Sequence, residues 1–286
     1  MNKATSTLLT LALILLTHAG VLAQTENYKQ GLSAIKNNRY HDAMISFTKV
    51  VSDEKYEISG KDLSLAYAYL AIIRTAYLNK DLENADFAQI SNSQGHIEQC
   101  LQEMARAIQF QDNSTKPLIA ESRKTLSSIS LRALEIIGDS LLTYDESEPN
   151  NTSIYLANFA VKRFGELEKI IDDNWQMYDI FGLAYFHLGD MERSMAEFDK
   201  ARTQFAKLES QPISQLHLKN YILSGNYFFS EKNDHKIAYK ISNEGSAYTS
   251  VLINGLGDDQ MTDILRLNKI ENRFRQYMTR IDESGK

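Results

Sequence analysis

The sequence predicts an all-α protein, and three observations favour this class. Only three prolines occur in 286 residues and glycine is sparse, so few residues interrupt a helix. Helix-forming residues such as Leu, Ala, Lys and Glu are common, whereas few runs alternate apolar and polar residues as a half-buried strand would. Apolar residues instead recur at steps of three and four, which places them on one face of a helix.

The clearest periodic segment runs from Tyr178 to Ala201 and predicts two helices joined by a tight turn. Gly189 can adopt the left-handed conformation that ends a helix. Asp190 can accept hydrogen bonds from the free N–H groups at the start of the next helix. The segment is therefore expected to form a helical hairpin.

This hairpin resembles a tetratricopeptide repeat. That family places an aromatic residue, then Leu-Gly, then Tyr on its first helix, and an Ala followed by Phe on its second. At the matching positions the chain has Tyr178, Phe181, Gly182, Tyr185, Ser194 and Phe198, with Phe181 in place of the family's Leu. Ser194 departs from the family pattern, which has Ala there.

The spacing within this hairpin recurs along the chain. A glycine and a large apolar residue stand sixteen residues apart three times: Gly31 and Phe47, Gly182 and Phe198, Gly225 and Ile241. The resemblance implies an αα-superhelix, or solenoid, of about five divergent hairpins followed by a capping helix. The expected hairpins cover about residues 24–53, 60–111, 117–172, 174–208 and 213–247, and the capping helix about 258–282. Residues 80–94 are an insertion, expected to form a loop or a short extra helix.

The first 23 residues have the features of a secretory signal peptide. Lys3 supplies a positive start, an apolar run follows, and small residues before Gln24 predict cleavage there. The alternative is a retained signal anchor. No cysteine follows Ala23, so a lipoprotein is not expected, and no later segment is long and apolar enough to span a membrane. We expect residues 24–286 to be one helical repeat domain, exported to the periplasm or secreted.

The charge of the chain argues against general binding of nucleic acid. The formal net charge is −6, and an acidic surface gives no attraction for phosphate. The last expected helix is nevertheless basic, with Arg266, Lys269, Arg273, Arg275 and Arg280. These residues indicate either contact with an anionic lipid or nucleic acid, or a solvated helix face to which Glu271 contributes.

In tetratricopeptide proteins, residues of the first helix in each hairpin line a concave groove. The resemblance implies that these residues bind a partner: Tyr28, Leu32, Ile35, Ala68, Ile72, Thr75, Asp179, Leu183, Phe186, Ile222, Asn226 and Phe229. Most are apolar or aromatic, so the expected partner is another protein or a peptide segment with an apolar or amphipathic surface. A clamp for a peptide carboxylate is not expected, because Tyr28 and Leu32 replace the family's Lys and Asn. The alternative is that some of these residues are covered by the chain's own loops or its last helix.

The sequence has no motif that predicts catalysis, a cofactor or a metal. No two of its six histidines lie three to five residues apart, and no HExxH, GxSxG or GxGxxG occurs. Cys100, the only cysteine, lies on an apolar helix face and is expected in the core. We therefore expect a non-catalytic scaffold or assembly adaptor of the cell envelope. The alternative is an exported enzyme or solute-binding protein that uses a central cleft, with His187 and Asp190 or Asp179 as polar groups.

Overall fold

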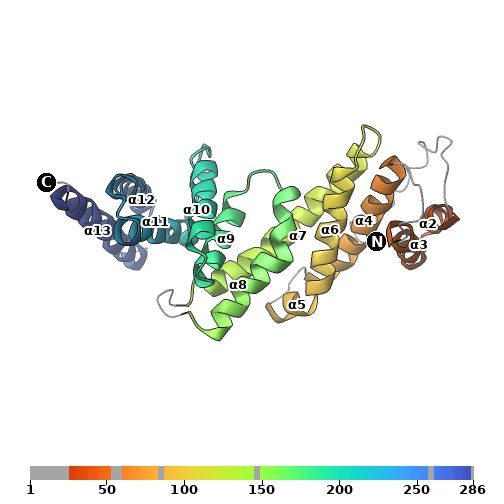
Figure 1. Cartoon of the computed structure of the whole chain (residues 1–286), viewed down its shortest axis with the longest axis horizontal. Coiled ribbons are helices and arrows are strands. Elements are labelled where there is room, and N and C mark those ends of the chain that lie inside the picture. Colours follow the sequence, from red (N-terminus) through yellow and green to blue (C-terminus); the bar gives the residue numbers. More distant parts are fainter. Residues whose placement is uncertain (1–25, 53–59, 83–86, 145–148, 257–260, 285–286) are drawn as a thin grey trace. The chain divides into compact units, whose positions relative to one another are not determined.

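The structure of the chain is a computed structural model that describes residues 26–52, 60–82, 87–144, 149–256 and 261–284 (Figure 1). Within these ranges every regular element is a helix and no strand occurs, so the all-α prediction is confirmed. None of the described helices combines the length and the apolar character that a membrane span requires. The expected signal peptide, residues 1–23, lies outside the described residues.

Contacts divide the chain into two compact units. The first comprises Met1–Ile136 with Phe159–Asp173, and the second comprises Ile137–Asn158 with Asn174–Lys286. The boundary therefore falls within two helices, α7 (Lys116–Leu141) and α8 (Asn151–Phe164), each of which contributes residues to both units.

The remaining elements of the first unit are α2 (Glu26–Lys36), α3 (Tyr40–Ser52), α4 (Gly60–Leu82), α5 (Phe87–Asn92), α6 (Gln94–Gln109) and the 3₁₀ turn η1 (Gly165–Lys169). Short helix α5 lies within the expected insertion at 80–94, of which residues 83–86 lie outside the described part. Asn38, in the turn between α2 and α3, has a positive φ of 55°, a conformation that Asn tolerates well.

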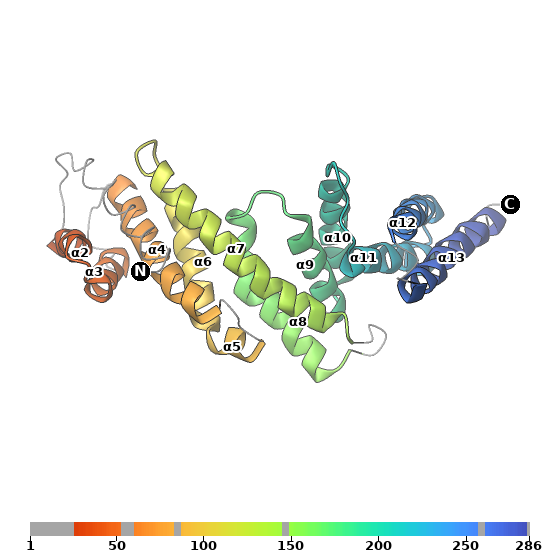
Figure 2. The same cartoon turned by 180° about the vertical axis from the view of Figure 1, so that it is seen from behind.

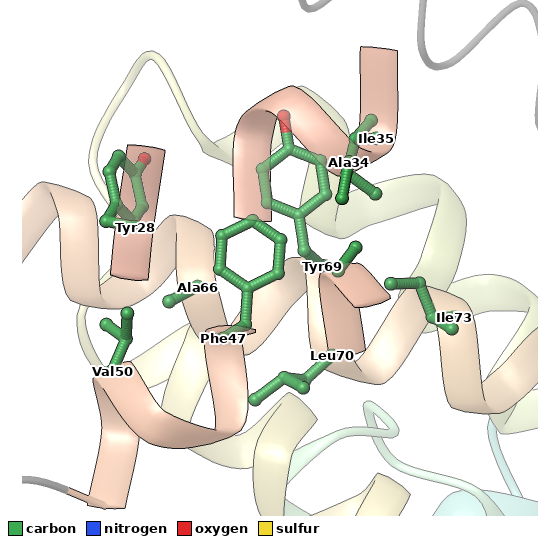
Figure 3. Close-up of a cluster of buried hydrophobic side chains, with 10 residues drawn as sticks. Tyr28, Ala34, Ile35, Phe47, Val50, Ala66, Tyr69, Leu70 and Ile73 are labelled. Atoms are coloured by element: carbon green, nitrogen blue, oxygen red, sulfur yellow. The ribbon is translucent and has the colours of Figure 1, made fainter. Parts of the chain in front are cut away.

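Aromatic side chains join α2, α3 and α4 in a buried cluster (Figure 3). The ring of Phe47 stacks on that of Tyr69 with centroids 5.0 Å apart. The Tyr28 ring meets the Phe47 ring edge-on, with centroids 5.9 Å apart. Gly31 makes room for this arrangement, because a Cβ atom there would lie 2.7 Å from the Phe47 ring.

An ion pair in a largely apolar setting joins α4 to α6. The Arg74 Nε donates to both carboxylate oxygens of Glu103 at 3.1 and 3.0 Å. Both side chains are largely buried, with exposed fractions of 13% and 8%. Burial raises the pKa of the Glu103 carboxyl to about 7, although Arg74 opposes this shift.

The second unit contains α9 (Trp175–His187), α10 (Met191–Phe205), α11 (Gln215–Asn226), the π-helical turn η2 (Tyr227–Glu231), α12 (His235–Gly255) and α13 (Met261–Ser284). Consecutive helices pack as pairs, α9 on α10 and α11 on α12, and α13 lies beside α12 (Figures 1 and 2).

Side-chain caps fix where four helices of the second unit begin. In each case the side chain just before the helix accepts a hydrogen bond from a backbone N–H of its first turn. The capping residues are Asn174 for α9, Asp190 for α10, Ser214 for α11 and Asp234 for α12. Each such cap stabilises a helix by about 1 kcal/mol. The turn before Asp190 contains Gly189 at φ 75°, as its sequence predicts.

The helix pairs of the second unit approach closely where one helix has a glycine. In the α9–α10 pair, a Cβ on Gly182 would lie 2.4 Å from the Phe198 ring, and the Ser194 Oγ donates to the Gly182 carbonyl at 2.8 Å. In the α12–α13 pair, a Cβ on Gly245 would lie 2.6 Å from the Phe274 ring. These contacts bring two helix backbones nearer than two larger residues would permit.

Candidate functional site

The π-helical turn η2 contributes side chains to two cavities of the second unit. Phe228 lines a cavity of about 820 Å³, and its neighbour Phe229 lines another of about 380 Å³. A π turn contains an extra residue, which changes the direction of the side chains that follow. Such turns are uncommon and frequently occur at functional sites, so both cavities are candidate sites.

The smaller cavity, here called the aromatic cavity, brings together three of the residues predicted to bind a partner. Phe186 comes from α9, Asn226 from α11 and Phe229 from η2. Helix α13 adds Tyr277, whose ring centroid lies 6.3 Å from that of Phe229, and Arg280. The remaining lining residues are Met191, Leu223, Tyr227, Ser230 and Glu231.

The aromatic cavity offers two kinds of contact. Its aromatic rings can surround an apolar side chain with large contact area. The Asn226 amide, the Ser230 hydroxyl and the Arg280 guanidinium can hydrogen-bond polar groups at its rim. Arg280 is exposed and forms no ion pair with another described residue.

Several other predicted binding residues are buried within the chain. Their side chains are occupied in packing and cannot meet a partner in this conformation: Tyr28, Ile35, Ala68, Thr75, Asp179 and Leu183. Of the predicted binding residues outside the aromatic cavity, three are half-buried: Leu32, Ile72 and Ile222. Leu32 and Ile72 belong to the first unit. The surface that remains available is therefore narrower than a groove lined by every predicted residue.

The burial of Asp179 and Leu183 has a common cause in helix α9. Spacing within a helix predicts one buried face, but nine of the thirteen residues of α9 are buried. A helix covered on most sides has no long open face for a ligand. Only near its C-terminal end does α9 present Phe186 to the aromatic cavity.

The larger cavity lies between α10, α11 and α12 and was not predicted from the sequence. Its apolar lining includes Met195, Tyr221, Phe228, Ile237, Ile241 and Val251. Its charged lining residues are Asp199, Arg202, Lys240 and Glu244. Because α10 and α12 are second helices of their pairs, a search confined to first helices does not find this cavity.

A buried hydrogen-bonded network extends from the larger cavity into the core. Arg202 Nη1 donates to the Oδ1 of Asn220 at 2.6 Å and to the Oγ of Ser224 at 2.8 Å. The Asn220 amide donates to Asp179 Oδ1 at 2.6 Å, and Asp179 Oδ2 lies 2.7 Å from His217 Nδ1. The network thus connects α9, α10 and α11 through buried polar side chains, of which only Arg202 reaches the larger cavity.

Aromatic rings enclose the histidine at the end of this network. The His217 ring stacks on Phe205 with centroids 3.9 Å apart, and the rings of Trp175, Tyr221 and Tyr248 meet it edge-on. Its Nε2 atom is buried and makes no hydrogen bond with the described residues. His217 and Asp179 are both fully buried, so neither side chain can touch a substrate in this conformation.

A tyrosine at the edge of the larger cavity connects α12 to the chain before α11. Burial raises the pKa of Tyr248 to about 12. Its hydroxyl donates to the Pro212 carbonyl at 2.6 Å and accepts from the Ser214 N–H at 3.1 Å. Tyr248 therefore fixes the connection between α10 and α11.

The polar residues of the enzyme alternative have structural partners. Asp190 caps α10 through the Arg193 N–H and pairs with the Arg193 side chain at 3.4 Å. His187 is buried, with 2% of its surface exposed. Among the described residues, no group of three or more His, Cys, Asp or Glu is arranged to hold a metal ion.

The comparisons with known proteins add no family to this description. No family model matches the sequence, and no curated protein matches it at a significant level, so the resemblance to tetratricopeptide repeats depends on the chain's own residues.

Proposed function

We propose that the chain is a non-catalytic scaffold or assembly adaptor that binds an apolar or amphipathic segment of another protein in the aromatic cavity. One observation carries this proposal: Phe186 of α9, Asn226 of α11 and Phe229 of η2 line a single cavity. Its volume of about 380 Å³ suits one or two large side chains of a partner rather than a long buried segment.

Recurring glycine–phenylalanine contacts support the tetratricopeptide-like part of the proposal. Gly31 meets Phe47 between α2 and α3, and Gly182 meets Phe198 between α9 and α10. Both pairs are sixteen residues apart. We propose that these hairpins are divergent repeats of one αα-superhelix, since a lone hairpin cannot bury its apolar faces.

The aromatic lining favours a protein partner over a polar solute. Aromatic side chains provide large contact areas with little loss of conformational entropy, and they are enriched where binding energy concentrates. Phe186 and Phe229 are half-buried, so each has an exposed part for a partner to contact. The chain's own α13 supplies Tyr277 to the same site.

We propose further that the chain is exported, because its first 23 residues have the composition of a signal peptide. Expression in a bacterium, followed by mass spectrometry of the periplasmic fraction, tests this. A mature chain that begins at Gln24 is expected, and an uncleaved chain held at the membrane would support the signal-anchor alternative.

The test of the binding proposal compares substitutions in the two cavities. Immobilised mature chain, its Phe229→Asp variant and its Val251→Asp variant are each incubated with the exported fraction of the source cells. Phe229 lines the aromatic cavity, whereas Val251 lines the larger one and is 58% exposed. We expect a protein that the unsubstituted chain and Val251→Asp retain and Phe229→Asp loses.

Circular dichroism and thermal unfolding of each variant serve as the control for folding. Phe186→Asp provides a second variant from a different helix of the same cavity. If all variants retain the same proteins as the unsubstituted chain, the aromatic cavity is not the binding site.

A solute-binding role remains a second candidate, because the larger cavity has about 820 Å³ and contains Arg202. A small ligand in this cavity would raise the melting temperature of the chain. Filling the cavity by Met195→Trp should then remove the shift, whereas Phe229→Asp should not. An unchanged melting temperature across a library of small anionic and apolar solutes would count against this role.

A further inference from the structure

Four basic side chains of α13 lie along one face of the helix. They follow one another at steps of three, four and seven residues, which places them on one side of an α-helix. The four residues are Arg266, Lys269, Arg273 and Arg280. All four are exposed, and none forms an ion pair with another described residue. These residues, here called the basic stripe, extend over roughly 21 Å at 1.5 Å per residue.

The other faces of α13 are already in use. Leu267, Phe274 and Ile281, each seven residues apart, form its buried face. Arg275 lies on a third face, where it donates to Glu271 at 2.7 Å. This hydrogen bond lowers the pKa of the Glu271 carboxyl, so that acid is ionised and committed to Arg275.

The basic stripe adjoins the aromatic cavity. Arg280 belongs to both, and Tyr277 projects from the helix between the stripe and the buried face. A ligand with one side chain in the aromatic cavity can therefore continue along the stripe. An extended peptide needs about seven residues to cover its full length.

The stripe is electrostatically unfavourable by itself. Like charges three and four residues apart on a helix repel each other, as Arg266 and Lys269, and Lys269 and Arg273, must do here. Carboxylates of a bound segment would relieve this repulsion and pair with the guanidinium groups in bidentate geometry.

We propose that the basic stripe and the aromatic cavity together bind an acidic segment of a partner protein that has an aromatic or large aliphatic anchor residue. The anchor occupies the cavity, and the acidic residues beside it pair with Arg280, Arg273 and Lys269. This proposal rests on the proposed function and specifies the chemistry of the partner.

An acidic peptide fits this surface better than a membrane or a nucleic acid. A helix that lies in a bilayer surface needs an exposed apolar face opposite its charges, whereas Leu267, Phe274 and Ile281 are buried in the fold. Single-stranded nucleic acid needs aromatic platforms along the basic track. Here the aromatic rings line a recess beside one end of the stripe.

The test begins with selection of random peptides of about ten residues, long enough to cover the stripe, displayed on phage and selected against the mature chain. Enrichment of peptides with several Asp or Glu beside one Phe, Tyr, Trp or Leu is the expected result. If basic or uncharged peptides are enriched instead, and the Phe229→Asp variant does not bind them, this inference is overturned while the proposed function stands. If no peptide is enriched, both fail.

An enriched acidic peptide, labelled with fluorescein, is then titrated with charge variants. Arg273→Glu with Arg280→Glu should weaken binding about tenfold, and added salt should weaken it further. Arg275→Glu is the matched control on another face and should change binding less than about twofold. Equal weakening by the control would show a general charge effect and overturn the assignment.

The same variants are tested against phosphatidylglycerol–phosphatidylcholine vesicles and a single-stranded oligonucleotide. The expected result is binding weaker than that of the selected peptide at the same salt. Tighter binding to either probe, lost in the double variant, would overturn the inference in favour of that class of ligand.

Discussion

Gly182 lies directly against the ring of Phe198, where an added Cβ would come within 2.4 Å of Cδ1. The contact joins α9 to α10, and the Ser194 hydroxyl reinforces it through a hydrogen bond to the Gly182 carbonyl. Phe198 is fully buried, so its ring has little space in which to move away. The absence of a side chain at Gly182 therefore sets the distance between these helices.

We predict that Gly182→Ala destabilises the protein. The substitution raises helix propensity by about 1 kcal/mol, but overpacking against a fixed ring costs about 1–3 kcal/mol. The net loss in the free energy of unfolding should therefore be up to about 2 kcal/mol, as measured by urea denaturation.

The matched control is Gly95→Ala in the first turn of α6, where a Cβ would meet nothing within 4 Å. This variant should be unchanged or more stable by up to about 1 kcal/mol. If both variants gain stability, the Phe198 ring adapts and the close contact does not constrain the helix pair.

The hairpin at Tyr178–Ala201 could be predicted because independent signals agree there. Apolar spacing gives two helices, Gly189 adopts the expected left-handed conformation, and Asp190 forms the expected cap. The sixteen-residue spacing between a glycine and a large apolar residue also predicted the contact between Gly31 and Phe47. The same spacing did not predict the neighbour of Gly225, because the side-chain atom nearest to a Cβ there is the Oγ of Ser242 and not an atom of Ile241.

The surface available for binding could be predicted only in part. Spacing identifies the faces of a helix but does not say how many of them neighbouring helices cover, which is why Leu183 is buried and Phe186 is not. The network of Asp179, Asn220 and Arg202 joins residues 18 to 41 positions apart, beyond any local pattern. One available signal was Asp179, the single acidic residue of the largely apolar helix α9.

Removing the Asp179 carboxylate should be strongly destabilising. Asp179→Ala leaves one N–H of the Asn220 amide and the His217 Nδ1 without their buried partner, which typically costs about 3–5 kcal/mol. The other N–H of that amide keeps its hydrogen bond to the Phe198 carbonyl. The free energy of unfolding from urea denaturation measures this loss. In a double-mutant cycle with Asn220→Ala, the combined loss should be smaller than the sum of the two single losses.

An exposed aspartate provides the control for Asp179. Asp42 pairs with Arg39 at 3.4 Å, and 53% of its side chain is exposed. Asp42→Ala should therefore change stability by less than about 1 kcal/mol. Similar effects for the two substitutions would show that the buried network adds little to stability.

Cys100 should be unreactive while the protein is folded. The side chain is fully buried in the first unit, and burial raises the pKa of its thiol, so very little thiolate is present. Labelling with a thiol reagent should be slow in buffer and fast in urea. Gln276→Cys, at an exposed position of α13, should label rapidly in both conditions.

The Glu103 carboxyl should make stability depend on pH in the neutral range. Its pKa is raised by burial from 4.5 to about 7, so the folded chain keeps a proton that the unfolded chain releases. Its contribution is therefore fully present below about pH 4.5 and is lost as the pH rises to about 7. Relative to a Glu103→Gln variant, the unsubstituted chain should lose on the order of 3 kcal/mol across this range.

Glu271 provides a control of opposite sign for this experiment. Its pKa is lowered by the hydrogen bond from Arg275, so its contribution is present at neutral pH and is lost as the pH falls through the acid range. Urea denaturation extended from pH 8 down to about pH 3 should thus give opposite trends, each relative to the unsubstituted chain: the difference for Glu103→Gln changes above about pH 4.5, and the difference for Glu271→Gln changes below it. A constant difference for Glu103→Gln would show that Arg74 keeps Glu103 ionised throughout, because the ion pair then outweighs burial.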